Sequence, residues 1–170
     1  YTGNEYNAIS AIWDYSKLPG TTAYNQTDEE LLNYYDFSSS TTHSDGLANG
    51  EIGGLYVDIE NEEGLYSRQA YVSYNGLMVC LGNSLTNSQA NNDREIFTTI
   101  NQVYAKNPSY KGSDFEGKIE IEDNSAILND EFAYYNIEGD NLIAKVSNVT
   151  GNINRRSEEH TSELQSLLII

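Results

Sequence analysis

The sequence predicts an all-β fold, an antiparallel β-sandwich, from two observations. Apolar and polar residues alternate in segments such as Leu55–Glu60 and Lys118–Glu122, and a period of two indicates half-buried strands. Asn75-Gly76 stands between two strand-like runs, and this pair suits a type I′ hairpin because both residues adopt positive φ. Strands do not alternate with long helical patterns, so antiparallel sheets are expected.

The expected strands are short and joined by polar loops. They cover Ala8–Trp13, Leu55–Glu60, Ser67–Tyr74, Ile96–Val103, Lys118–Glu122, Ala126–Leu128, Phe132–Ile137 and Leu142–Val146. One short helix is expected over Thr27–Tyr35, because Thr27 suits an N-cap and acidic residues occupy the first turn. Ser38–Asp45 and Asn83–Asp93 are rich in Ser, Thr, Asn and Gln and are expected to be loops.

The charge of the chain excludes several classes of partner. The 170 residues include 26 Asp and Glu against 9 Lys and Arg, a net charge of −17. Such a surface repels phosphate backbones and anionic lipids, so we expect neither nucleic acid nor a membrane as a partner. The apolar run Leu167–Ile170 is far shorter than the roughly 20 residues of a membrane span. With Cys80 as its one cysteine, the chain forms no intrachain disulfide and no cysteine-based zinc site.

The residues show no complete catalytic or metal motif. A nucleophilic triad needs a histidine, and His43-Ser44-Asp45 is expected to be a turn, because contiguous side chains do not converge in the required geometry. The acidic runs, such as Glu60–Glu63, are typical of solvated surface. No Asp-x-Asp-x-Asp-Gly loop is present, so we expect no metal site and no cofactor, with a structural calcium ion in an irregular loop as the alternative left open.

The two ends of the chain carry a further prediction. The chain starts at Tyr1 without a methionine, and Arg156–Ser166 is the peptide read in frame from a common sequencing-library adapter. We therefore expect residues 156–170 to be a non-native tail, with a short amphipathic helix as the alternative. Residues 1–155 are then expected to be an internal fragment of a longer gene product.

Four blocks of the sequence occur in the order of a known enzyme family. Tyr1–Thr22 contains a Gly-x-Glu-Tyr motif followed by Trp13 and Leu-Pro-Gly-Thr-Thr; the others are Ser44–Gly46, Ser67–Gly82 and Thr98–Gln102. Together they resemble the central β-domain of the polysaccharide lyases that include chondroitin AC lyase, hyaluronate lyase and xanthan lyase. The resemblance covers about residues 1–102. It implies that residues 1–155 are a fragment of a larger β super-sandwich domain that follows an N-terminal α/α toroid.

The resemblance also implies an activity. Such lyases are secreted or periplasmic and cleave acidic, uronate-containing polysaccharides by β-elimination. In the family, the Asn, His, Tyr and Arg that carry most of the chemistry lie in the toroid, so the fragment alone is expected to be inactive. The implied partners are the acidic polysaccharide and the toroid domain of the same chain.

Three residues of the first block are candidate site residues on this resemblance. Glu5 matches the family's glutamate, whose implied role is to hold the catalytic arginine; the alternative is an ordinary surface glutamate. Asn7 adjoins Ala8, where chondroitin lyases have a substrate-contacting asparagine. Trp13 either shapes the domain junction or contacts the sugar. Asn7 and Trp13 are therefore predicted to bind substrate.

A second class of function is consistent with the composition. The chain contains 14 tyrosines and many asparagines, which suit a noncatalytic carbohydrate-binding or adhesive sandwich. The two hypotheses differ at Glu5, which matters for turnover in a lyase and has no necessary role in sugar binding by an adhesive module.

Overall fold

The computed structural model describes residues 9, 12–27, 29–30, 39–61, 64–87, 94–138, 142–150, 152–155, 158–161 and 165–169. The chain divides into two compact units. The first unit consists of Tyr1–Thr21 with Thr98–Ile170, and the second unit consists of Thr22–Phe97.

The described residues of both units form antiparallel β-sheets, as the sequence predicts. Their strands are β1 (Thr22–Tyr24), β2 (Ser39–Ala48), β3 (Ile52–Asn61), β4 (Leu65–Tyr74), β5 (Leu77–Asn87), β6 (Ile96–Thr98), β7 (Gln102–Tyr104), β8 (Ser109–Tyr110), β9 (Ser113–Asp114), β10 (Gly117–Ile121), β11 (Ser125–Asn129), β12 (Phe132–Asn136), β13 (Leu142–Val149), β14 (Asn152–Arg155), β15 (Glu158–Thr161) and β16 (Gln165–Ile169). Neighbouring strands run antiparallel in the β10-β13-β16-β7, β12-β11-β8-β9 and β2-β3-β4-β5 sheets and in the β14–β15 pair.

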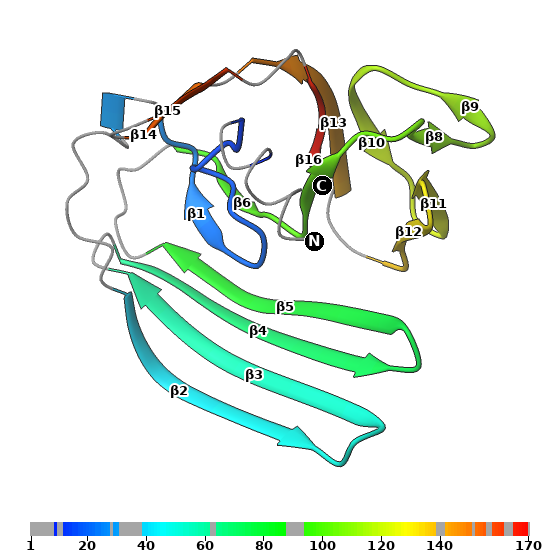
Figure 1. Ribbon diagram of the computed structural model, residues 1–170. Helices are drawn as coiled ribbons and strands as arrows, with labels where there is room; N and C mark the ends of the chain where they lie inside the picture. The colour runs from blue at the N-terminus through cyan, green and yellow to red at the C-terminus, as the bar shows by residue number, and fades with distance from the viewer. Residues whose placement is uncertain are drawn as a thin grey trace. The chain divides into compact units, whose positions relative to one another are not determined.

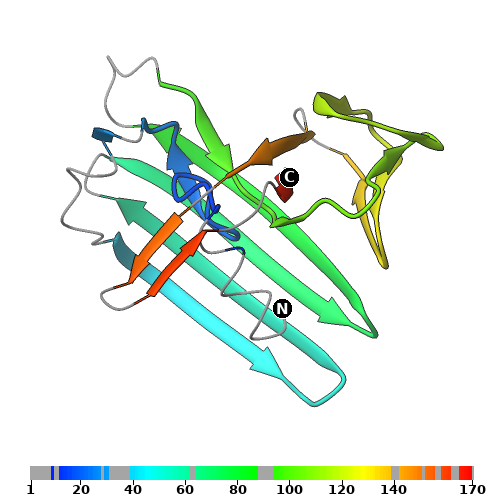
Figure 2. The same ribbon diagram turned by 45° about the horizontal axis from the view of Figure 1, so that its top comes forward.

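The second unit contains a four-stranded meander in the order β2-β3-β4-β5 (Figures 1 and 2). The predicted hairpin joins β4 and β5, and both of its turn residues have positive φ, 46° at Asn75 and 79° at Gly76. The prediction of a type I′ turn is therefore confirmed. At the same end of the sheet, the Asn49 side chain closes the β2–β3 turn by accepting hydrogen bonds from the amides of Glu51 at 3.0 Å and Ile52 at 2.9 Å.

Two predicted loops of the second unit are wrong in whole or in part. Ser38–Asp45 lies in strand β2 from Ser39 onward, and His43-Ser44-Asp45 is part of that strand and not a turn. Strand β5 extends through Asn83–Asn87, and residues 88–93 lie outside the described residues. β2 and β5 are the outer strands of the meander, where pairing with one neighbour fixes the backbone even of a polar segment.

The start of the predicted helix carries a capping box. The Thr27 amide donates a hydrogen bond to the Glu30 carboxylate at 2.8 Å, and the Glu30 amide donates to the Thr27 hydroxyl at 3.3 Å. Glu29 and Glu30 are helical, so the N-cap prediction is confirmed. Residues 31–38, which include the rest of the predicted helix, lie outside the described residues.

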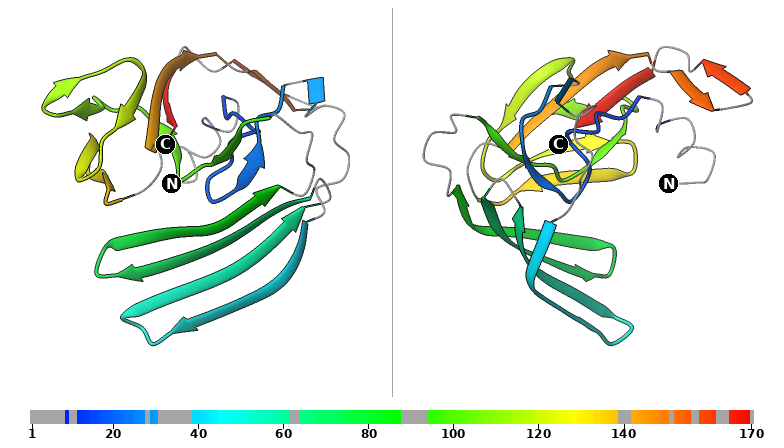
Figure 3. Two further views of the ribbon diagram at one scale, coloured as in Figure 1. Left: turned by 180° about the vertical axis from the view of Figure 1, so that it is seen from behind. Right: turned by 90° about the vertical axis from the view of Figure 1, so that its left-hand side faces the viewer.

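The first unit contains two four-stranded sheets and one strand pair (Figure 3). The sheet orders are β10-β13-β16-β7 and β12-β11-β8-β9, and β14 pairs with β15. Four buried residues from both sheets, Ile121, Ile127, Ala144 and Val146, form the core of this unit. Ala144 and Val146 are two positions apart on β13, so strand alternation places both on the buried face.

Two strand predictions in the first unit need correction. The predicted strand Ala8–Trp13 is wrong, because Ile9 is helical and the Ile12 amide donates to the Ile9 carbonyl at 3.0 Å. A spacing of three residues places Ile9 and Ile12 on one face of a helical turn, where both are buried. The predicted strand Ile96–Val103 is interrupted between β6 and β7 at residues 99–101.

Over the part of the chain that the structure describes, no helix has the length and apolar character needed to cross a membrane.

The hairpin at Asn75-Gly76 allows a matched test of backbone conformation. Gly76→Ala is expected to destabilise the chain by about 1–2 kcal/mol, because an L-residue at positive φ is strained. Gly82→Ala in β5 is the control, since a Cβ atom at either glycine meets nothing within 4 Å and only Gly76 has positive φ. Denaturant unfolding followed by circular dichroism measures both. Equal effects of the two substitutions would contradict the turn assignment.

Candidate functional site

The described part of the predicted site is a loop over residues 12–21, held by Gln102 at the start of β7. The Gln102 side chain is completely buried. Its Oε1 atom accepts a hydrogen bond from the Asp14 amide at 2.7 Å, and its Nε2 atom donates to the carbonyls of Asp14 at 3.2 Å and Lys17 at 3.1 Å. One side chain thus satisfies three backbone groups of an irregular loop, which a strand ladder would otherwise pair.

The loop continues into a tight turn that also pairs with the segment before Gln102. The Thr21 amide donates to the Leu18 carbonyl at 3.1 Å, and Gly20 has a φ of 78°. With Pro19 preceding this glycine, the turn is of type II. The Gly20 amide then donates to the Thr99 carbonyl at 2.7 Å, and the Thr99 amide donates to the Thr21 carbonyl at 2.9 Å. The loop is therefore fixed at both of its ends.

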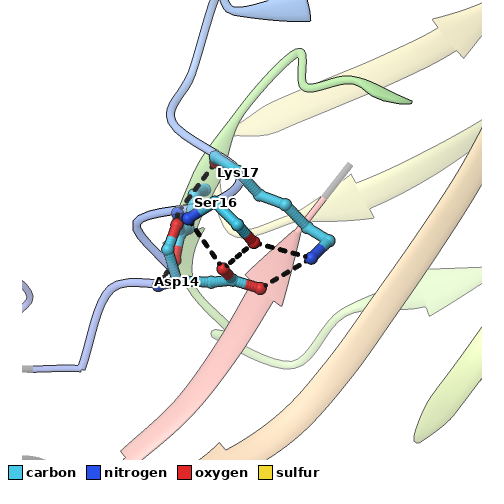
Figure 4. Close-up of polar contacts among 4 residues, drawn as sticks. Asp14, Ser16 and Lys17 are labelled. Carbon is cyan, nitrogen blue, oxygen red and sulfur yellow. Dashed lines mark hydrogen bonds and ion pairs between the residues drawn. The ribbon is translucent and has the colours of Figure 1, made fainter. Parts of the chain in front are cut away.

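Asp14, Ser16 and Lys17 form a charged cluster on this loop (Figure 4). Asp14 Oδ1 accepts hydrogen bonds from the Ser16 amide at 3.0 Å and from the Ser16 hydroxyl, and Asp14 Oδ2 accepts one from Lys17 Nζ at 2.9 Å. Burial by itself raises the pKa of Asp14, but the hydrogen bonds from Ser16 and Lys17 outweigh it and bring the pKa below its ordinary value. Asp14 is ionised at neutral pH and bound to these donors, so it suits positioning rather than proton abstraction.

Trp13, next to Asp14 in the sequence, packs against an apolar cluster. Buried Ile9 and Ile12 pack against Trp13, together with Tyr104 and Val149. The Trp13 ring meets the Tyr15 ring edge to face, with centroids 6.4 Å apart and planes at 71°. Trp13 is half-buried, whereas Tyr15 is 56% exposed. Tyr15 therefore presents the more exposed aromatic surface of this pair.

The structure places one of the three predicted site residues. Trp13 lies in the loop that Gln102 holds, whereas Glu5 and Asn7 lie outside the described residues. The roles of Glu5, Asn7 and Trp13 stay predictions.

The sequence reasoning missed the cluster around Gln102. Its residues come from two of the motif blocks, Tyr1–Thr22 and Thr98–Gln102, and the Gln102–Asp14 hydrogen bonds join residues 88 positions apart. Two sequence features could have indicated it: the Pro19-Gly20 turn lies in a segment without strand alternation, and Gln102 stands directly before the apolar residues Val103 and Tyr104. A buried amide next to an irregular loop is a frequent solution for unpaired backbone groups.

A second polar group lies on the meander of the second unit. The Tyr56 hydroxyl donates a hydrogen bond to the Asp58 carboxylate. Arg68 Nε lies 3.5 Å from Oδ1 of the same carboxylate and donates a hydrogen bond to the Tyr66 hydroxyl at 2.8 Å. The hydrogen bond to Asp58 is the main cause of the raised pKa of Tyr56. His43 stacks at a tilt on the Tyr56 ring, with centroids 5.8 Å apart. A phenol whose proton is held in this way is a poor general base.

No group of three or more His, Cys, Asp and Glu side chains within the described ranges is arranged to hold a metal ion. The expectation of no cofactor, with structural calcium as its alternative, stays a prediction.

The antiparallel sheets indicate an all-β protein of the sandwich class. The family model described as polysaccharide lyase family 8, super-sandwich domain, matches residues 1–169. The chain belongs to this family, and the resemblance seen in its motifs is thereby confirmed.

One relative among characterised proteins supports the same assignment. The chain is 27% identical over 167 residues to chondroitinase-AC of Pedobacter heparinus, a match that covers 95% of this chain and 23% of that protein. The chain thus spans less than a quarter of the length of that relative. No solved structure matches the chain significantly.

The family match bears on the description of the C-terminal residues. It extends to residue 169, and β16 pairs with β13 from Val149↔Gln165 to Lys145↔Ile169. The assignment of residues 156–170 to an adapter-derived tail stays a prediction, as does residue 155 as the end of the domain.

Replacing Gln102 tests whether its hydrogen bonds hold the loop. Gln102→Met keeps the approximate volume but leaves backbone groups of Asp14 and Lys17 without their partner. Each buried group left unsatisfied costs about 1–3 kcal/mol, so we expect a loss of at least ~2 kcal/mol in the free energy of unfolding. Half-buried Gln26→Met is the control. A loss at Gln102 no larger than at Gln26, by denaturant unfolding, would refute the role of Gln102.

The Asp14 cluster predicts a dependence of stability on pH. Since the pKa of Asp14 lies below its ordinary value of 3.8 in the folded chain, its contribution is complete above that value and is lost as pH falls through the lower folded pKa. The stability difference between the wild type and Asp14→Asn should therefore be largest near neutral pH and shrink below about pH 4. Urea unfolding at several pH values measures it, and a difference that grows towards acid pH would contradict the assignment.

Proposed function

We propose that the chain is part of a polysaccharide lyase that cleaves uronate-containing polysaccharides by β-elimination. The family match over residues 1–169 carries this proposal, and the similarity to a chondroitinase-AC supports it. The chain acts together with an N-terminal α/α toroid that supplies most of the reactive groups. By itself it is expected to show no turnover.

The chemistry sets clear demands on such an enzyme. The carboxylate of the uronate must be neutralised, the proton on C5 must be removed, and the 4-linked oxygen must leave with a proton to give an unsaturated sugar. Because the C5 proton is only weakly acidic, preorganised donors must meet the charge that develops on the carboxylate. The base must also lie within hydrogen-bond reach of that proton.

In this proposal the chain supplies Glu5 as a positioning residue and Asn7 and Trp13 as substrate contacts. Glu5 holds the toroid's arginine through a charge-assisted hydrogen bond. What supports a positioning role is that described residues further along the chain are fixed: Ile9 is buried, and Gln102 binds the backbone at Asp14. Small displacements of catalytic groups cost large factors in rate, so a fixed anchor close to Glu5 along the chain has a use.

An acidic polymer as substrate bears on the location of the protein and on its charge. A polymeric substrate lies outside the cell membrane, so a secreted or periplasmic enzyme is proposed. The net charge of −17 repels a polyanion, and basic groups on the toroid would provide the attraction at the cleft.

A noncatalytic carbohydrate-binding module is the second candidate function. The exposed Tyr15 ring beside Trp13 favours it, because aromatic faces stack on sugars. In that case the isolated chain binds a polysaccharide and Glu5 has no effect on the binding.

Substitution of Glu5 separates the two functions. In the lyase that joins the chain to its toroid, Glu5→Ala is expected to lower kcat by about 100-fold or more with little change in KM. The reason is that an arginine no longer held by Glu5 stabilises the charge of the transition state less well, while substrate binding in the ground state changes little. Glu5→Gln, which keeps an acceptor oxygen, should restore part of the activity. Formation of the unsaturated uronate, followed by its ultraviolet absorbance, measures turnover.

The control for this experiment is Glu51→Ala, which changes an exposed glutamate in the β2–β3 turn. A fall in kcat of less than about tenfold for Glu5→Ala, near 1.4 kcal/mol, would count against the positioning role. Binding of polysaccharide by the isolated chain that survives Glu5→Ala, without turnover in the longer protein, would favour the carbohydrate-binding module.

A further inference from the structure

Most basic side chains in the described ranges are paired with a carboxylate. The whole chain carries 9 Lys and Arg against 26 Asp and Glu. Ion pairs at 2.7–3.5 Å involve Lys17, Arg68, Arg94, Lys106 and Lys111. Lys118 and Lys145 are exposed, and within the described residues neither forms an ion pair. Two ammonium groups therefore remain unpaired on the surface of a strongly acidic chain.

These two lysines stand directly opposite one another. The register of β10 with β13 pairs Lys118 with Lys145. Directly opposed residues have Cβ atoms roughly 4.5–5.5 Å apart, and like charges at this spacing destabilise a sheet. The acidic residues next along the chain, Glu116 and Glu120, form no ion pair with either lysine in the part of the chain that the structure describes. The pair lowers the stability of the sheet, which is tolerated where a surface serves binding.

The lysine pair lies on the same sheet face as the side chain of Gln102. The registers pair Lys145 with position 169 of β16 and position 169 with Gln102 of β7, so Lys118, Lys145 and Gln102 stand in one row across the sheet. Directly opposed residues share a face. The residues that alternate with the two lysines point to the other face, where Ala144 and Val146 belong to the core of the unit.

Aromatic side chains occupy the β7 side of the lysine face. Tyr104 follows Gln102 by two positions, so strand alternation places it on that face. It packs against the same two buried isoleucines as Trp13, and the Trp13 ring meets the exposed Tyr15 ring. The loop over residues 12–21 therefore borders this face of the sheet.

The aromatic and basic parts of the face are close enough for one oligosaccharide to cover both. Neighbouring strands lie about 4.8 Å apart, and Lys145 and Lys118 are two and three strands away from Gln102 in the sheet order. The distances across the sheet are thus roughly 10 and 14 Å.

We propose that Lys118 and Lys145 form a site for the anionic groups, carboxylate or sulfate ester, of the polysaccharide that the lyase cleaves. Ammonium groups from two strands meet such a group from two sides through charge-assisted hydrogen bonds. The aromatic rings at the β7 side stack on sugars of the same polymer. The proposal rests on the proposed function, since the ligand is the substrate of the proposed lyase. It also provides a local attraction in a chain whose net charge of −17 repels a polyanion.

Kinetics of the full-length lyase, which joins the chain to its toroid, test the site. In the variant that combines Lys118→Gln with Lys145→Gln, KM for unsulfated chondroitin is expected to rise about tenfold while kcat stays within about twofold, because the contact binds substrate and transition state alike. The control combines Lys106→Gln with Lys111→Gln, which removes the same charge from ion-paired lysines of the same unit. Its KM is expected to change less than about twofold.

Two further comparisons identify the chemistry of the contact. Lys118→Arg combined with Lys145→Arg keeps both charges and is expected to keep KM near the wild-type value. Chondroitin sulfate is measured beside unsulfated chondroitin. An equal rise in KM on both polymers assigns the carboxylate to the site, and a rise on the sulfated polymer alone assigns the sulfate ester.

Equal KM values for the Lys118→Gln, Lys145→Gln variant and its control would overturn the proposal. A lower melting temperature of that variant would also overturn it, because the lysines would then serve stability. Wild-type dimers in sedimentation that the variant does not form would overturn it too, and would identify an acidic surface of a second copy as the occupant.

A separate measurement distinguishes failure of the site from failure of the proposed function. If the full-length protein shows no turnover, the lyase function fails, and equilibrium binding of chondroitin sulfate by calorimetry, with neutral dextran as the control, tests the site alone. Binding that weakens about tenfold in the Lys118→Gln, Lys145→Gln variant supports the site. Binding of equal strength in wild type and variant overturns it.

Discussion

The first unit depends on the burial of one amide side chain. Gln102 replaces a strand partner for the loop over residues 12–21, because its donor and acceptor match backbone groups at Asp14 and Lys17. Backbone groups buried without partners cost several times what a hydrogen bond contributes. A loop without regular structure can therefore enter the body of the unit only where such a side chain meets it. This contact sets where Trp13 lies.

The charged cluster on that loop serves the same end by another means. Asp14 is half-exposed, so its ion pair with Lys17 contributes modestly to stability in water. The main effect of the Asp14 carboxylate is on the conformation of the loop. It accepts hydrogen bonds from both Ser16 and Lys17 and so holds the backbone of residues 14–17 in a turn. The apolar contacts of Ile9 and Ile12 then provide the burial that the polar contacts do not. Polar and apolar contacts together hold the loop over residues 12–21.

Local pattern predicted much of the fold where strands alternate or where a turn has a specific chemical requirement. Asn75-Gly76 was identified because positive φ restricts the residues a type I′ turn accepts, and Thr27 because a helix start needs a side-chain acceptor. The predictions failed at Ser39–Asp45 because polar composition says little about an outer strand, whose backbone can be paired whatever the polarity of its side chains. They failed at Ile9 and Ile12 because two apolar residues in a short segment fit a strand and a helical turn almost equally well.

The sequence by itself determined the class of fold, the family and the candidate residues Glu5, Asn7 and Trp13, because these depend on local periodicity and on motifs read in order. Only the tertiary structure decided that Gln102 joins two of those motifs and that Lys118 and Lys145 stand opposite one another. Both results depend on which residues lie opposite one another across strands or across 88 positions of chain. A one-residue change of register moves every side chain of a strand to the other face, and local pattern alone does not specify that register.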